Sequence, residues 1–305
     1  MILLLMNEYF NYKKTNMTSL MYVDKNRGSD NLQVNLDIDL YNLPCELLSI
    51  EIRNHLGLNV KNIEGNLTKY TFDSKRKIIG QKPYSLESLG KFNHDHDHFA
   101  QPDYELVKTQ IKNKEGCKLK GKFFLDAVPG TFIISSMAFS PTIEKLRREG
   151  LDKTNVEHVI NDLSFGERIP RYRLLGFGYR AYNLIHTLKN KNRLNDKIPM
   201  TYQYYLKIVP TKFRYYNRGT TYDKYQYTAN SFSENSLDRI PILFFRYDLS
   251  PITVEYKQIK MSFLTFMINV FAILGGVFTV AGIIDAIIHK SVLMLLRKAE
   301  MNKIA

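Results

Sequence analysis

Residues 31–40, NLQVNLDIDL, decide the fold class of this chain. Their apolar members alternate strictly with polar ones and are Leu32, Val34, Leu36, Ile38 and Leu40. Successive side chains of a β-strand point to opposite faces, so the apolar side chains would share one face. The pattern predicts a strand with one face in a protein core.

Similar patterns surround this segment. Two strands are expected in CKLKGKFFLDAVPGTFIISSMAF (117–139), joined at the turn Pro129-Gly130. Others are expected in TKYTFDS (68–74), DKYQYTANSF (223–232) and TYQYYLKIVPTKFRYY (201–216), where one face would carry Tyr202, Tyr204, Leu206 and Ile208. The best helical pattern is PTIEKLRREGL (141–151). Several short strands separated by turns predict a mostly β chain folded as an antiparallel β-sandwich.

The chain ends differently. Residues 261–288, MSFLTFMINVFAILGGVFTVAGIIDAII, include 24 uncharged residues between Lys260 and Asp285. At about 1.5 Å per residue, a helix of this length crosses a hydrocarbon layer of about 30 Å. The segment therefore predicts a transmembrane helix rather than a buried core helix, which is rarely so long and apolar on every side.

Small residues recur along this helix at spacings of three and four, and they are Ala272, Gly275, Gly276, Thr279 and Gly282. In lipid, small residues on one face allow a second helix to approach closely. We expect the second helix to come from this chain, a second copy or another protein. The alternative is that the glycines only loosen the helix.

Composition and motifs restrict the chemistry. The net charge is +13, but the lysines are spread along the chain, so we expect no nucleic-acid binding. The sequence contains no GxSxG, P-loop or GxGxxG motif, and we expect neither catalysis nor a cofactor. His94, His96 and His98 could hold zinc or copper on a strand, although a solvated loop is the preferred interpretation.

Two cysteines are present, Cys45 and Cys117, and no CxxC motif. This excludes a thioredoxin-type centre and a zinc site with four cysteine ligands. Their spacing alone leaves open one disulfide or two free thiols. Two sequons, at Asn16 and Asn66, predict N-glycosylation if this part of the chain is lumenal.

LFFRYDLSPITVEY (243–256), with the apolar segment that follows it, resembles the C-terminal membrane region of the endoplasmic-reticulum vesicle (Erv) proteins. This is the ER–Golgi intermediate compartment family of cargo receptors. The other matching motifs follow in the family's order from residue 7 to about 290. They are YVDKNRGSDNLQVNLDIDLYNLPCELLSIEI (22–52), EGCKLKGKFFLDAVPGTFIIS (115–135), NVEHVINDLSFGE (155–167) and YQYYLKIVPT (202–211).

The resemblance implies a protein with two transmembrane helices, both short ends in the cytosol and a lumenal β-domain between them. Residues 1–12 would be the remnant of a truncated first helix and 13–256 the lumenal domain. Residues 257–288 would be the transmembrane helix and 289–305 the cytosolic tail. Cys45 and Cys117 match the family's Pro-Cys and Gly-Cys positions, which implies that they pair.

Members of the family form complexes with one another and cycle between ER and Golgi membranes in COPII and COPI vesicles, where they sort or retrieve cargo proteins. They are not enzymes. The cysteine-rich CxxC insert of the long-form members is missing here, and Lys303 stands alone where a dilysine signal would need a second lysine. Retrieval is then expected to depend on a partner subunit. The alternatives are a membrane-anchored structural subunit of a stable organellar complex and a lumenal metalloenzyme that uses the histidine loop.

Overall fold

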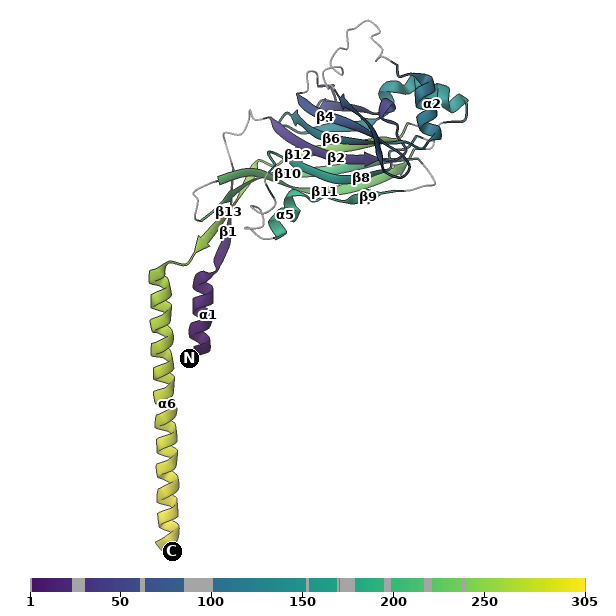
Figure 1. Ribbon diagram of the computed structural model, residues 1–305. Helices are drawn as coiled ribbons and strands as arrows, with labels where there is room; N and C mark the ends of the chain where they lie inside the picture. The colour runs from purple at the N-terminus through teal and green to yellow at the C-terminus, as the bar shows by residue number, and fades with distance from the viewer. Residues whose placement is uncertain are drawn as a thin grey trace. The chain divides into compact units, whose positions relative to one another are not determined.

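The computed structural model describes residues 2–23, 31–60, 64–84, 101–151, 154–168, 170, 179–194, 199–216, 221–236 and 240–304. Contacts divide the chain into two units. The first comprises Met1–Ser19, Arg214–Thr220 and Lys257–Ala305. The second comprises Leu20–Phe213 and Thr221–Tyr256 and holds the two stacked sheets in Figure 1.

One layer of the sandwich is a six-stranded sheet in the order β5-β4-β6-β2-β8-β9. Its strands are β5 (Ile78–Tyr84), β4 (Gly65–Phe72), β6 (Gly116–Leu125), β2 (Leu32–Leu40), β8 (His158–Phe165) and β9 (Lys191–Arg193). Every adjacent pair is antiparallel. The predicted strand at 31–40 is confirmed as β2, and its five alternating apolar residues are fully buried. The alternation therefore identified the core face of this layer.

One glycine allows β4 to lie close to β6. Gly121 is paired with Leu36 on one side and Leu67 on the other. Its φ is +152°, and a Cβ at this position would lie 2.1 Å from the carbonyl oxygen of Asn66. Only glycine fits this backbone position, because any side chain would push β4 away from β6.

The other layer is a seven-stranded sheet with the path β1-β13-β10-β12-β7-β3, and β11 also pairs with β10. Its strands are β1 (Thr15–Val23), β13 (Ile252–Lys260), β10 (Met200–Arg214), β12 (Ile242–Leu249), β7 (Gly130–Ser135), β3 (Ser49–Asn54) and β11 (Thr221–Asn235). The structure departs from a purely antiparallel sandwich, since β10 and β12 are parallel. Parallel neighbours need a long connection, and residues 215–241, which include β11, supply it.

The strands on either side of Pro129-Gly130 form as predicted, but they belong to different layers. β6 pairs with β2 and β4, whereas β7 pairs with β3 and β12. The turn therefore carries the chain from one sheet to the other instead of closing a hairpin. Both strands bury apolar side chains in the same core.

A series of aromatic ring contacts joins the two layers inside the core, edge-to-face between the sheets and stacked within the seven-stranded sheet. Ring centroids are 5.5 Å apart between Phe123 and Phe132, 4.5 Å between Phe132 and Phe245, and 5.1 Å between Phe245 and Tyr204. Tyr204 then meets His158 of the six-stranded sheet at 5.7 Å. The series begins on β6 and ends on β8 of the six-stranded sheet, and between them it passes through β7, β12 and β10 of the other sheet. These contacts fix how the two sheets stack.

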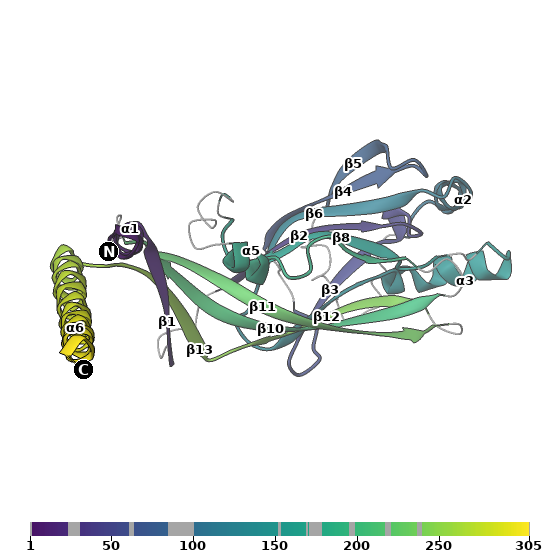
Figure 2. The same cartoon turned by 90° about the horizontal axis from the view of Figure 1, so that it is seen from below.

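Short helices close the sandwich. They are α2 (Tyr104–Lys112), α3 (Ser140–Arg148) and α5 (Tyr179–Ile185), with 3₁₀ turns at η1 (Cys45–Leu47) and η3 (Met137–Phe139). Figure 2 shows α2 and α3 at the same end of the stacked sheets. The predicted helix at 141–151 corresponds to α3, which has a proline in its first turn and buries Ile143 and Leu146. Proline suits this position because the backbone N–H groups of the first turn have no acceptor within the helix, so the N–H that proline lacks is not missed.

The first unit contains two helices, α1 (Ile2–Lys13) and α6 (Phe263–Ile304). Within the described ranges, α6 is the one helix long and apolar enough to cross a membrane, over Phe263–Leu296. The predicted transmembrane segment began at residue 257, but the structure keeps residues 257–260 in β13. Backbone pairing with the sheet thus delays the start of the helix until after Lys260.

Candidate functional site

A polar clasp joins α1 to α6. The Asn269 amide nitrogen donates to a Glu8 carboxylate oxygen at 2.7 Å. One α-helical turn nearer the sheet, the rings of Tyr12 and Phe266 lie 4.7 Å apart, and the Lys260 ammonium is 5.2 Å from the Tyr12 ring. The hydrogen bond and the ring contact together hold α1 and α6 in one register.

The row of small residues on α6 points away from this clasp. At about 100° per residue, the row from Ala272 to Gly282 is centred about 110° around the helix from the face that carries Phe266 and Asn269. A Cβ added at Gly275, Gly276 or Gly282 would meet nothing within 4 Å. Among the described residues, nothing packs against this face, and α1 occupies a different one.

The two cysteines lie together in the sandwich. Cys45 begins the turn η1, and Cys117 lies on β6 between Leu40 and Thr71 of the neighbouring strands. The structure joins their sulfurs in a disulfide, with Cα atoms 4.8 Å apart and a sequence separation of 72. Both cysteines are buried. The bond attaches a turn that has few backbone hydrogen bonds to the centre of the six-stranded sheet.

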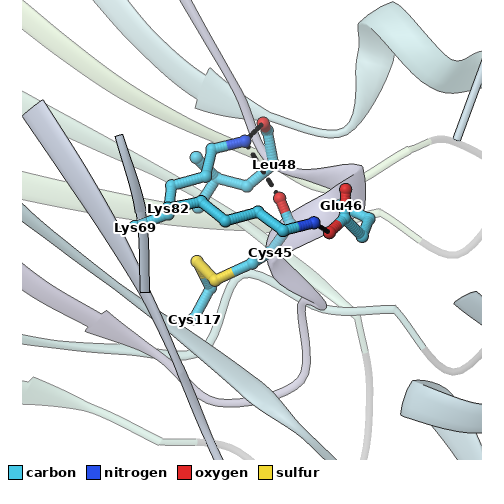
Figure 3. The surroundings of a disulfide bond; sticks show 6 residues. All are labelled: Cys45, Glu46, Leu48, Lys69, Lys82 and Cys117. Atoms are coloured by element: carbon cyan, nitrogen blue, oxygen red, sulfur yellow. Dashed lines mark hydrogen bonds and ion pairs between the residues drawn. A yellow bond between two sulfur atoms is a disulfide. The ribbon is translucent and has the colours of Figure 1, made fainter. Parts of the chain in front are cut away.

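A lysine supports the same turn from the side (Figure 3). The Lys69 ammonium donates to the carbonyl oxygens of Cys45 at 2.9 Å and Leu48 at 2.6 Å, and it lies 4.3 Å from the Tyr84 ring. Burial lowers the pKa of Lys69 from 10.5 to about 7, although the nearby Glu46 carboxylate favours the charged form. Glu46 also forms an ion pair with Lys82. The turn is thus held by a covalent bond and by two hydrogen bonds from the buried Lys69 side chain.

His158, in the motif at 155–167, is fully buried beneath the ring series. Its Nδ1 lies 2.8 Å from the Val156 carbonyl oxygen, which can only accept, so Nδ1 carries the proton. Nε2 then accepts from the Tyr204 hydroxyl at 2.8 Å. Burial lowers the pKa of His158 from 6.5 to about 4. The neutral ring is therefore part of the folded core.

The predicted modification sites are exposed. Asn16 lies at the start of β1, and Asn66 lies on β4 opposite Lys122 of β6. Exposure is compatible with glycosylation, which stays a prediction. His94, His96 and His98 lie outside the described residues, and within those residues no group of three His, Cys, Asp or Glu side chains could hold a metal.

Sequence reasoning missed two of these contacts. Lys69 occupies the same face of β4 as the buried Leu67, so a charged residue interrupting an apolar alternation was a readable signal. The clasp had a weaker signal, because Glu8 and Asn269 are separated by most of the chain and only suggest each other as polar residues within apolar segments.

Family comparisons agree with this architecture. The family model described as endoplasmic reticulum vesicle transporter matches residues 84–285, and that of the Endoplasmic Reticulum-Golgi Intermediate Compartment matches residues 1–60. The chain belongs to the endoplasmic reticulum vesicle transporter family. The predicted resemblance is thereby confirmed. This vesicle transporter is a membrane protein of ER–Golgi vesicle traffic, with its place in the membranes of the ER–Golgi intermediate compartment.

Individual relatives give the extent of the likeness. Endoplasmic reticulum-Golgi intermediate compartment protein 1 of Danio rerio is 29% identical over 295 residues, covering 94% of this transporter and 82% of the relative. Protein disulfide-isomerase 5-4 of Arabidopsis thaliana is 34% identical over 194 residues, but the match covers 62% of this transporter and 39% of the plant protein. Because the match covers so little of the plant protein, it gives no ground for assigning isomerase activity to this chain.

The crystal structure of Erv41p has the same fold. It superposes with a TM-score of 0.51 at 22% identity and covers 78% of this transporter and 99% of the Erv41p chain. The expected mostly β fold with a C-terminal apolar helix is confirmed by the sheets, α6 and this likeness.

Proposed function

We propose that this transporter is a cargo receptor that cycles between ER and Golgi membranes in COPII and COPI vesicles. Its sandwich, within residues 13–256, would lie in the lumen and bind cargo or a partner receptor. Residues 289–305 would face the coat in the cytosol. The observation that carries the proposal is the family match across 84–285, which includes β6 to β13 of the sandwich and the first part of the membrane helix α6.

Charge and cysteines are compatible with this orientation. Lys290, Arg297 and Lys298 follow the apolar segment, as the positive-inside tendency expects for a cytosolic end. The disulfide between Cys45 and Cys117 suits an oxidising lumen. The proposal includes no catalytic role and no cofactor.

Protease protection on microsomes tests the orientation, with a C-terminally tagged chain and endoglycosidase H on the same samples. We expect a protected fragment of about residues 13–256 that loses mass with the glycosidase, and digestion of the tag. Digestion of the sandwich with survival of the tag would reverse the orientation and remove the basis for a lumenal receptor.

The alternative is a membrane-anchored structural subunit of a stable organellar complex. Vesicle budding from washed microsomes with added coat proteins separates the two functions. A cycling receptor should be enriched in the budded vesicles over a resident ER membrane protein. Recovery equal to the resident protein would favour the structural subunit.

The row of small residues on α6 is the proposed contact with the partner, a family paralogue or a second copy. Changing Gly275 and Gly276 to Leu should lower co-purification of the partner at least about fivefold, because the added side chains prevent close helix approach. The matched control is Ala281→Leu, which adds the same side chain about 150° around the helix. Equal recovery from both variants would contradict the contact.

A further inference from the structure

The outer face of the six-stranded sheet carries a cleft of about 780 Å³. We call it the outer cleft and define it by Gln33, Asn35, Asn66, Lys120, Lys122 and Arg168. These residues come from β2, β4, β6 and the loop after β8. The cleft therefore lies entirely within the second unit, on the side of the sheet away from the core.

Charges on its floor are matched except at one position. Lys118, Lys120 and Lys122 alternate along β6, and opposite them β2 presents Asp39, Asp37 and Asn35. The Lys118 ammonium lies 2.9 Å from Asp37 and 3.3 Å from Asp39, and Lys120 lies 3.4 Å from Asp37. An amide replaces the carboxylate opposite Lys122.

Lys122 has no carboxylate on its other side either, because its partner on β4 is Asn66. Among the described residues, no ion pair involves Lys122, and its side chain is exposed to the cleft. Two neighbours of the same type are neutralised, so the unmatched charge is a local feature and not a consequence of the basic composition.

Hydrogen bonds hold the floor and rim in place around this lysine. The buried Asn35 amide nitrogen donates to the carbonyl oxygens of Gly166 at 2.7 Å and Ser164 at 3.4 Å, and Asn35 Oδ1 accepts from Gln33 Nε2 at 2.9 Å. The Gly166 amide in turn donates to the Gln33 carbonyl oxygen at 2.7 Å. Asn35 is thus hydrogen-bonded to the rim loop, and its uncharged amide leaves the charge of Lys122 without a counter-charge.

The rim adds a second positive group. Arg168 is half exposed, and its nearest carboxylate, Asp162, is 3.8 Å away. Glu167 is the single acidic side chain in the lining, against Lys120, Lys122 and Arg168. A carboxylate entering the cleft would form a charge-assisted hydrogen bond with Lys122 in a preformed site.

We propose that the outer cleft binds an acidic segment of a protein, with one carboxylate at Lys122 and a neighbouring one at Arg168. The inference names the chemistry of a lumenal partner and rests on the proposed function only for where that partner is met. Binding by the purified chain is measured without transport, so either proposal can fail alone.

The test uses the full chain in nanodiscs of phosphatidylcholine, treated with endoglycosidase H and with Asn66 unchanged because it lines the cleft. The probe is fluorescein-labelled hexaglutamate, with hexaserine as the uncharged comparison, and binding is read by anisotropy. We expect Lys122→Gln to weaken hexaglutamate binding about tenfold, as loss of a charge-assisted hydrogen bond predicts. Arg168→Gln should weaken it by a smaller factor.

The matched control is Lys112→Gln, which removes the same charge from an exposed position on α2. It should leave binding within about twofold of the parent, because an exposed distant charge is screened by salt. Equal losses in Lys112→Gln and Lys122→Gln would show general attraction to a basic protein and overturn the site. Binding of hexaserine as tight as that of hexaglutamate would also overturn it.

Discussion

Replacing Cys45 and Cys117 by alanine should lower the free energy of unfolding of the sandwich by about 4 kcal/mol. The disulfide closes a loop of 72 residues, and opening it gives the unfolded chain the entropy of that loop. The bond also attaches η1 to β6, so its loss should loosen this turn, which Lys69 also holds. Urea unfolding followed by tyrosine fluorescence measures the difference, since the chain has 20 tyrosines and no tryptophan.

Reduction of the disulfide distinguishes the effect of losing the covalent bond from the effect of replacing the two cysteine side chains. Dithiothreitol should destabilise the parent by a similar amount and leave the double alanine variant unchanged. If reduction and substitution each cost less than about 1 kcal/mol, the loop-closure account would be wrong for this domain. Non-reducing electrophoresis of the parent checks that the bond is present before the comparison is made.

Acidification from pH 7 to pH 5 should lower the free energy of unfolding by about 2 kcal/mol through His158 alone. The pKa of this ring is about 4 in the folded chain and 6.5 in its ordinary state, so the unfolded chain binds more protons between these values. The stabilisation is complete above pH 6.5 and disappears as the pH falls toward 4. Charging the ring would leave a cation in the core beside the Tyr204 hydroxyl.

His158→Gln should abolish most of this pH dependence while lowering stability at pH 7, because glutamine can accept from Tyr204 but does not titrate. The control is His55→Gln at an exposed position, which should keep the parent's pH dependence. Urea unfolding at pH 5, 6 and 7 gives the slope of the free energy of unfolding against pH for the parent and for each of the two variants. A slope for His158→Gln equal to that of the parent would assign the acid sensitivity to other groups.

Some of the candidate sites could be recognised from the local sequence, and others could not. The family motifs pointed to Cys45 and Cys117, and the spacing of Gly275 and Gly276 identified a helix face, because each signal lies in a short piece of sequence. Lys69, His158 and Lys122 acquire their properties from neighbours on other strands. The apolar alternation around Lys69 hints at its burial, but its partner Tyr84, the bond from Tyr204 to His158 and the missing carboxylate beside Lys122 all depend on other strands.

Local pattern alone identified several elements of this protein. Alternation identified β2 and its buried face, because a half-buried strand imposes a period of two. An uncharged run identified the membrane helix, because a lipid layer requires a minimum length of apolar residues. Only the tertiary structure decided that β6 and β7 lie in different sheets, that β10 and β12 are parallel and that Glu8 meets Asn269. These contacts join residues far apart in sequence, and their geometry follows from how two layers share one core.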